Sequence, residues 1–262
     1  MFKEKNEYLI AVPFEFIRGE IPNKMKPGII MAYCWCARFG TRDGLYHNSL
    51  NEISNEMGLH YNKAKDRHHP QRIRNFRDGL QYLIDNSYVF LIDGDLKNYD
   101  SVLKVQVNYD YDLSRYVLIN FKHFDYIFTL NQRIDKNNLI YILAWILSWY
   151  EKITINSKET TLSICSYSSE KIAKQIGLNP LSVARYLKLL SGTIDENYPL
   201  VKEEKITYLY QGQYVSVPAI YVENTPYANQ MIAMRNNYYK RKIAQNNSAL
   251  PNNFEEVDDD LI

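Results

Sequence analysis

The chain has 262 residues, 46% of them hydrophobic and 23% charged, and its formal net charge is +1. This composition suits a globular protein that can bury two modest cores. Because MFKEKNEY at the N-terminus has mixed charge and LIYILAWILSW at 139–149 is too short to cross a bilayer, we expect no secretory signal, no membrane span and a cytoplasmic location.

The N-terminal part of the chain predicts an apolar strand and a buried helix, followed by two more helices. The buried helix is an apolar run that contains Cys34 and Cys36. Three cysteines offer no plausible disulfide framework, so we expect these two to be reduced core residues. SLNEISNEMGL at 49–59 places Ile53 and Met57 four residues apart, which predicts one face of the next helix.

A β-hairpin is predicted after these helices. YVFLI at 88–92 and SVLKVQV at 101–107 flank the polar segment DGDLKNYD at 93–100, which is the pattern of two strands joined by a turn. The carboxylates of Asp93 and Asp95 have the chemistry of metal ligands, but Asp and Gly are also ordinary turn residues. The turn is the favoured interpretation.

Residues 168–190, SSEKIAKQIGLNPLSVARYLKLL, predict a second pair of helices. Ile172 and Ile176 share one helical face, and Gly177 follows where glycine can end a helix in the left-handed conformation. The Asn-Pro pair after it supplies a good N-cap and a good first helical residue. Further on, ITYLY and YVSVPAIYV flank QGQ, which predicts a tight hairpin.

The two parts of the chain match each other, which predicts an internal duplication. At an offset of 119, Ser49, Ile53, Met57, Gly58 and Leu59 match Ser168, Ile172, Ile176, Gly177 and Leu178. At an offset of 110, Phe14, Phe16, Ile17, Ile30 and Trp35 match Phe124, Tyr126, Ile127, Ile140 and Trp145. At an offset of 107, Phe76, Leu80 and Leu83 match Val183, Leu187 and Leu190. The changes in offset imply nine extra residues around EKITINSKET in the second copy and twelve within HYNKAKDRHHPQ in the first.

Two short helices joined through a glycine resemble a helix-turn-helix, in which the second helix lies in the DNA major groove. An ordinary helical hairpin is the alternative. A helix-turn-helix followed by a β-hairpin resembles a winged helix, and the expected fold is α+β with two such domains in tandem. The expected divisions are winged-helix domains at 7–112 and 113–223, a basic helix at 224–244 and a disordered acidic tail at 245–262.

Charge is unevenly distributed along the chain. The segment 251–262 contributes −5, so residues 1–250 carry +6. The run at 60–77 alone carries +5, and it falls where the second helix of the first pair would meet phosphates. A solvated charged face is the alternative, although such faces usually mix signs. The stretch at 234–242 adds +4 and predicts either a phosphate-contacting helix or a solvated terminal helix.

No catalytic motif stands out. The chain has no glycine-rich phosphate loop and no Cys-x-x-Cys pair. His60, His68 and His69 could hold a metal or activate a nucleophile, but they lie in the basic run, and a histidine there can also simply add charge. We therefore expect a binding protein rather than an enzyme, without a cofactor or metal.

The tandem arrangement and the basic segment resemble the replication initiators of theta-replicating plasmids and phages. This resemblance covers residues 7–223 and implies sequence-specific binding of double-stranded DNA at repeated origin sequences, with dimers and monomers in opposite roles. It implies groove-facing residues in the second helix of each pair: Arg72, Arg74, Asn75 and Arg77 in the first copy, and Ser182, Arg185, Tyr186 and Lys188 in the second. The expected DNA-binding set also includes Lys63, Lys65 and Arg67 of the basic run and Asn179 at the start of the second recognition helix.

Two other functions remain open from the sequence: a transcriptional regulator of a mobile element and a winged-helix interaction module of a replisome. The C-terminal DDDLI is similar to the acidic-hydrophobic tip of bacterial single-stranded DNA-binding proteins, which recruits partners. The tail is thus expected to be a solubilising end, a partner tag for a replisome protein, or a competitor of DNA for the basic run.

Overall fold

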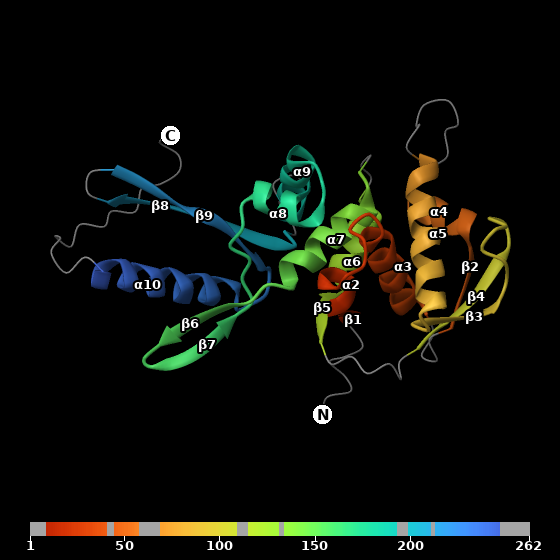
Figure 1. Cartoon of the computed structure of the whole chain (residues 1–262), viewed down its shortest axis with the longest axis horizontal. Coiled ribbons are helices and arrows are strands. Elements are labelled where there is room, and N and C mark those ends of the chain that lie inside the picture. The colour runs from red at the N-terminus through yellow and green to blue at the C-terminus, as the bar shows by residue number, and fades with distance from the viewer. Residues whose placement is uncertain are drawn as a thin grey trace. The chain divides into compact units, whose positions relative to one another are not determined.

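The computed structural model describes residues 9–40, 45–57, 69–108, 115–130, 134–192, 199–210 and 213–246, and its elements confirm an α+β protein (Figure 1). The described strands form four small antiparallel sheets. The chain divides into two compact units, Met1–Trp145 and Ile146–Ile262.

In the first unit, β1 (Leu9–Pro13) pairs with β5 (Tyr116–Asn120) along all five residues, and Figure 1 shows the two strands side by side. Alternate residues of both strands are buried, as expected for a ribbon with one face on a core. A short helix and then a longer apolar helix follow each strand. These are α2 (Phe14–Arg18) and α3 (Lys26–Phe39) after β1, and α6 (Phe121–Thr129) and α7 (Lys136–Leu147) after β5.

Lys26 and Lys136 match at the predicted offset of 110, and their side chains make similar contacts, with acceptors one residue out of that register. Lys26 donates a 3.2 Å hydrogen bond from Nζ to the carbonyl oxygen of Ile17, and Lys136 donates one from Nζ to that of Phe128. Both lysines begin an apolar helix, are at most 6% exposed, and bind a carbonyl in the last turn of the preceding short helix. Each therefore satisfies an oxygen that the helix end would leave without a partner.

The tryptophans of the two copies make reciprocal contacts. The ring of Trp35 lies 4.9 Å from that of Phe128, and the guanidinium of Arg18 lies 4.4 Å from the Trp145 ring. Arg18 and Phe128 occupy matching positions at the offset of 110, as do the two tryptophans. Each copy thus places the last turn of its short helix on the tryptophan of the other copy, a relation that supports the predicted duplication.

The other described elements of the first unit are two helices and a three-stranded sheet. In chain order the elements are β2 (Leu45–Ser49), α4 (Leu50–Glu56), α5 (His69–Asp85), β3 (Val89–Asp93) and β4 (Val102–Val107), and the sheet order is β2-β4-β3. A capping box starts α4, because Ser49 Oγ accepts the Glu52 N–H and Glu52 accepts the Ser49 N–H. Gly28 and Gly79 let α3 and α5 cross with their backbones in contact, since a Cβ on Gly79 would lie 2.3 Å from the carbonyl carbon of Gly28.

The boundary between the compact units lies after Trp145, whereas the sequence placed a domain boundary between 112 and 113. The difference has a physical cause: β5 completes the β1 ribbon, and Arg38 donates two 2.8 Å hydrogen bonds to the Asp125 carboxylate. These contacts hold the first strand and short helix of the second copy within the first unit.

The second unit begins with an additional hairpin, β6 (Glu151–Ile155) and β7 (Lys158–Leu162), at the place where nine extra residues were predicted. It continues with α8 (Ser169–Ile176), α9 (Pro180–Leu190), the hairpin of β8 (Val201–Tyr210) and β9 (Gln213–Glu223), and α10 (Ala228–Asn246). Cys165 and Tyr221 exchange backbone hydrogen bonds of 2.9 and 3.0 Å, which attach the segment before α8 to β9.

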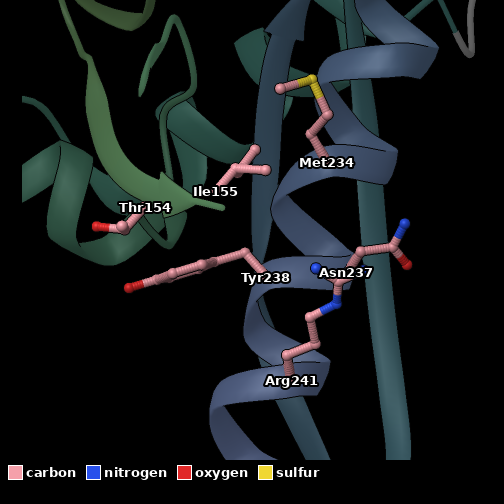
Figure 2. Close-up of a pocket in the computed structure, with 6 residues that line it drawn as sticks. All are labelled: Thr154, Ile155, Met234, Asn237, Tyr238 and Arg241. Carbon is pink, nitrogen blue, oxygen red and sulfur yellow. The ribbon is translucent and has the colours of Figure 1, made fainter. Parts of the chain in front are cut away.

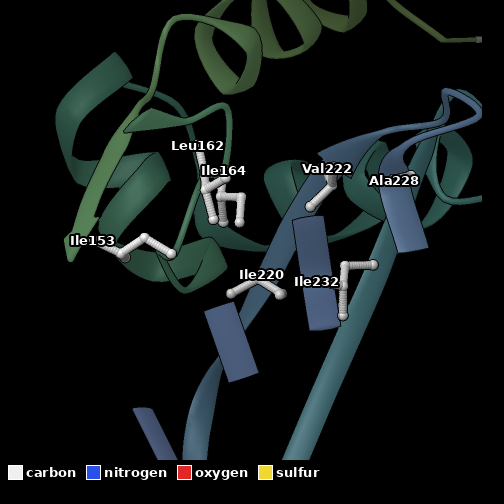
Figure 3. Close-up of a cluster of buried hydrophobic side chains, with 7 residues drawn as sticks. All are labelled: Ile153, Leu162, Ile164, Ile220, Val222, Ala228 and Ile232. Carbon is white, nitrogen blue, oxygen red and sulfur yellow. The ribbon is translucent and has the colours of Figure 1, made fainter. Parts of the chain in front are cut away.

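A cluster of buried aliphatic side chains joins the extra hairpin, β9 and the start of α10 (Figure 3). Its members are Ile153, Leu162, Ile164, Ile220, Val222, Ala228 and Ile232. The predicted C-terminal helix at 224–244 is therefore present as α10, with one face packed on this core. It extends to Asn246, so the first two residues assigned to the tail are helical, while 247–262 lie outside the described residues.

The predicted core cysteines lie in one of the apolar helices, α3. Cys34 and Cys36 are free and buried in α3, and burial raises the pKa of both thiols, that of Cys36 to about 12. Within the described part of the chain, no helix is both long and apolar enough to cross a membrane.

Candidate nucleic-acid interface

The turn between α8 and α9 is built as the sequence predicted. Ser168 caps α8 by accepting the Lys171 N–H at 3.3 Å, and Gly177 ends it with φ +73°, in the left-handed region. Asn179 then caps α9 by accepting the Leu181 N–H at 2.9 Å, and Pro180 is the first helical residue. The Asn179 side chain is thus engaged in starting the helix that it was expected to help bind DNA.

Tyr186 was predicted to face a DNA groove, and this prediction is wrong. Its side chain belongs to the buried face of α9. Tyr186 is only 9% exposed and lies three residues after buried Val183 and four before buried Leu190. At that spacing an aromatic ring extends the apolar stripe rather than the opposite face. Ser182, Arg185 and Lys188 are exposed, as predicted.

The exposed face of the helix pair is predominantly basic. Lys171 and Lys174 are exposed on α8, Arg185 and Lys188 are exposed on α9, and Glu170 is the one carboxylate between residues 168 and 190. Leu181, whose side chain is 82% exposed on α9, is a residue that the sequence prediction did not include. Leu181 lies two residues before Val183 and therefore outside the apolar stripe of the helix. This spacing could have predicted that its side chain is exposed.

In the first copy, fewer exposed cations are described than the sequence predicted. Lys63, Lys65 and Arg67 lie outside the described residues. Arg74 is exposed on α5. Arg72 lies near Asp135: burial raises the pKa of the Asp135 carboxyl, and the charge of Arg72 opposes this shift.

Arg77 and Asn75 make contacts within the protein. Arg77 forms a 2.7 Å ion pair with Asp78 and donates a hydrogen bond to the Tyr99 hydroxyl at 3.4 Å. Asn75 Oδ1 accepts a 2.7 Å hydrogen bond from Gln71. The exposed ridge of α5 also carries both signs, since its members are Arg74, Asp78, Gln81 and Asp85. Of the two predicted recognition helices, α9 therefore has the clearer basic face.

The basic stretch of α10 contains one buried and one exposed arginine. Arg235 is 4% exposed and donates 3.1 Å hydrogen bonds to Glu151 and to Ser166 Oγ, so its role is to fasten α10 to the extra hairpin. Arg241 is exposed and lines a shallow pocket of about 140 Å³ between this hairpin and α10. Figure 2 shows Tyr238 and Ile155 at the same pocket, with Arg241 one turn below Asn237.

The alternative metal and catalytic sites receive no added support from the described residues. Asp93 accepts the Gly94 N–H at 2.8 Å and Asp95 accepts the Lys97 N–H at 2.9 Å, as in ordinary turns. Among the residues that the structure describes, no group of three His, Cys, Asp or Glu side chains could hold a metal ion. His60 and His68 lie outside those residues.

Comparisons of the chain with known protein families, with curated proteins and with solved structures found no match.

Proposed function

We propose that this chain is a sequence-specific double-stranded DNA-binding protein that initiates replication of a plasmid or phage through two tandem winged-helix domains. The observation that carries the proposal is the exposed surface of α9, where Ser182, Arg185 and Lys188 are exposed and the two cations lie opposite the buried stripe. Residues on the outer face of the second helix of such a pair are those that enter the major groove.

The order of elements supports winged-helix domains. In the first unit α3, β2, α4, α5, β3 and β4 follow one another, and β2 pairs with the strand that ends the hairpin. In the second unit, the bridge at Cys165 takes the place of β2, before α8, α9 and the β8–β9 hairpin. In both copies the hairpin is the next described element after the second helix of the pair, where a wing is expected.

In the proposed mechanism, one cation recognises a DNA base and the others add affinity for the DNA backbone. The planar Arg185 guanidinium donates two hydrogen bonds to O6 and N7 of a guanine, the most frequent specific contact in the major groove. Lys188 on α9 and the exposed lysines of α8 neutralise backbone phosphates, which adds affinity on any sequence. Because two helix pairs are covalently linked, binding of one raises the effective concentration of the other on the same DNA.

The experiment begins with selection of binding sites from random duplexes by the full-length protein. Arg185→Ala is expected to lose ~1–3 kcal/mol on the selected duplex and much less on random DNA. The matched control is Lys152→Ala, which removes a 72% exposed lysine of the extra hairpin that pairs with Glu159 at 3.0 Å. The control should bind like the wild type.

The outcomes separate the candidate functions. Direct repeats beside the protein's own gene support an initiator, and a palindrome over a promoter supports a transcriptional regulator instead. Equal losses for Arg185→Ala on selected and random DNA would make Arg185 a phosphate contact. Absence of any salt-dependent DNA binding would refute the proposal and favour an interaction module.

A further inference from the structure

Leu181 is an apolar side chain on the surface that is proposed to face DNA. Its exposed fraction of 82% exceeds the 67% of Tyr227 and the 56% of Val102. A single exposed leucine is ordinary on a protein surface. Leu181, however, lies in the first turn of α9, among the residues that enter the groove most deeply in a helix-turn-helix.

The position of Leu181 is well fixed. Its backbone N–H is bound to the Asn179 side chain at 2.9 Å, and it follows Pro180, whose φ is fixed by its ring. The inner face of α9 is filled by other residues, since Val183 and Leu187 are at most 2% exposed. The leucine is therefore held at the surface by the turn that begins the helix.

Leu181 also belongs to the same helical stripe as the proposed guanine contact. Leu181, Arg185 and Lys188 are separated by four and three residues, so they follow one another along one exposed face. In a helix the separation of four residues from Leu181 to Arg185 corresponds to a rise of ~6 Å, about two base-pair steps of DNA. An apolar side chain and a guanidinium with two parallel donors thus lie about two base-pair steps apart along the helix.

From this arrangement we infer that Leu181 contacts the C5-methyl group of a thymine within about two steps of the guanine bound by Arg185. Thymine is the base that presents an apolar group in the major groove, and apolar side chains recognise it there. This inference rests on the proposed function and deepens it, because it assigns a second base to the same helix.

The test uses the selected duplex with each thymine replaced in turn by deoxyuridine, which removes only the methyl group. The wild type should lose about three- to fivefold in affinity at one position near the guanine, the effect of burying one methyl-sized group. Leu181→Ala should lose a similar factor on the unmodified duplex and show no further loss with deoxyuridine at that position. Urea unfolding should be unchanged, because the side chain is exposed.

Tyr227→Ala is the matched control, since it removes another exposed apolar side chain of the same unit. It should retain the wild-type sensitivity to deoxyuridine. If the wild type tolerates every replacement, or if Leu181→Ala remains sensitive at the same position, this inference fails while the Arg185 effect can still stand. If no duplex is enriched at all, the proposed function fails and the thymine contact fails with it.

Discussion

The buried lysine that begins α7 predicts a pH dependence of stability. Lys136 is 4% exposed, and its Nζ donates to the Phe128 carbonyl and lies 5.4 Å from the ring of the same residue. Burial lowers the pKa of Lys136 from 10.5 to about 8, because the charged form loses contact with water. The perturbation to test is Lys136→Met, which keeps an unbranched apolar chain and removes the titrating group.

The magnitude follows from linkage between protonation and folding. Between about pH 8 and pH 10.5 the unfolded chain keeps the Lys136 proton while the folded chain has lost it. Because the unfolded state then binds more protons, the free energy of unfolding rises with pH across this window. The shift from 10.5 to about 8 corresponds to ~3 kcal/mol.

The assay is urea unfolding of the wild type and of Lys136→Met from about pH 7 to about pH 10. Buried tyrosines and cysteines with raised pKa values lower stability over part of the same range, so the difference between the two proteins is the quantity to follow. It should move by ~3 kcal/mol in favour of the wild type as pH rises. A difference that stays constant with pH would refute the assignment. Lys26→Met should show the same sign, since burial and the charge of Arg18 lower the pKa of Lys26.

Three other substitutions test the fold and the interface. Gly79→Ala should cost about 3 kcal/mol in thermal or urea unfolding, because its Cβ would lie 2.3 Å from the backbone of Gly28; an unchanged stability would contradict the helix crossing. Glu151→Ala should cost ~3–5 kcal/mol by leaving the Arg235 guanidinium buried without its carboxylate, whereas removing the exposed ion pair of the β6–β7 hairpin should cost less than about 1 kcal/mol. Arg74→Ala should weaken binding to all duplexes and lower the slope of log affinity against log salt by about one unit; a loss confined to one sequence would make Arg74 a base contact.

Features set by neighbouring residues could be predicted from the sequence. The serines at matching positions in the two copies, Ser49 and Ser168, both cap helices, and Gly177 adopts the left-handed conformation that its place required. The extra hairpin occupies the insertion inferred from the change of offset. The caps and the left-handed helix end depend on a few consecutive residues, whose backbone preferences hold regardless of what packs around them.

Features set by distant contacts could not be predicted in the same way. Tyr186 has a polar hydroxyl, and only the packing of α9 decides that its ring joins the buried face. The boundary of the first unit depends on the pairing of β1 with β5, which are more than a hundred residues apart. The apolar alternation within one strand does not indicate which other strand it pairs with.

The two buried lysines show how a repeat can hold information that an analysis of apolar periodicity misses. Lys26 and Lys136 match at the offset of 110, but a lysine in the first turn of an apolar helix is the usual sign of an exposed side chain. Here each lysine is buried next to the last turn of the preceding short helix. A carbonyl oxygen of that turn has no partner within the helix, and the lysine Nζ donates a hydrogen bond to it. A charged residue at the same repeat position in both copies is thus explained by the turn between the two helices rather than by a surface role. It follows that matching polar positions of a duplication are as informative about the core as matching apolar ones.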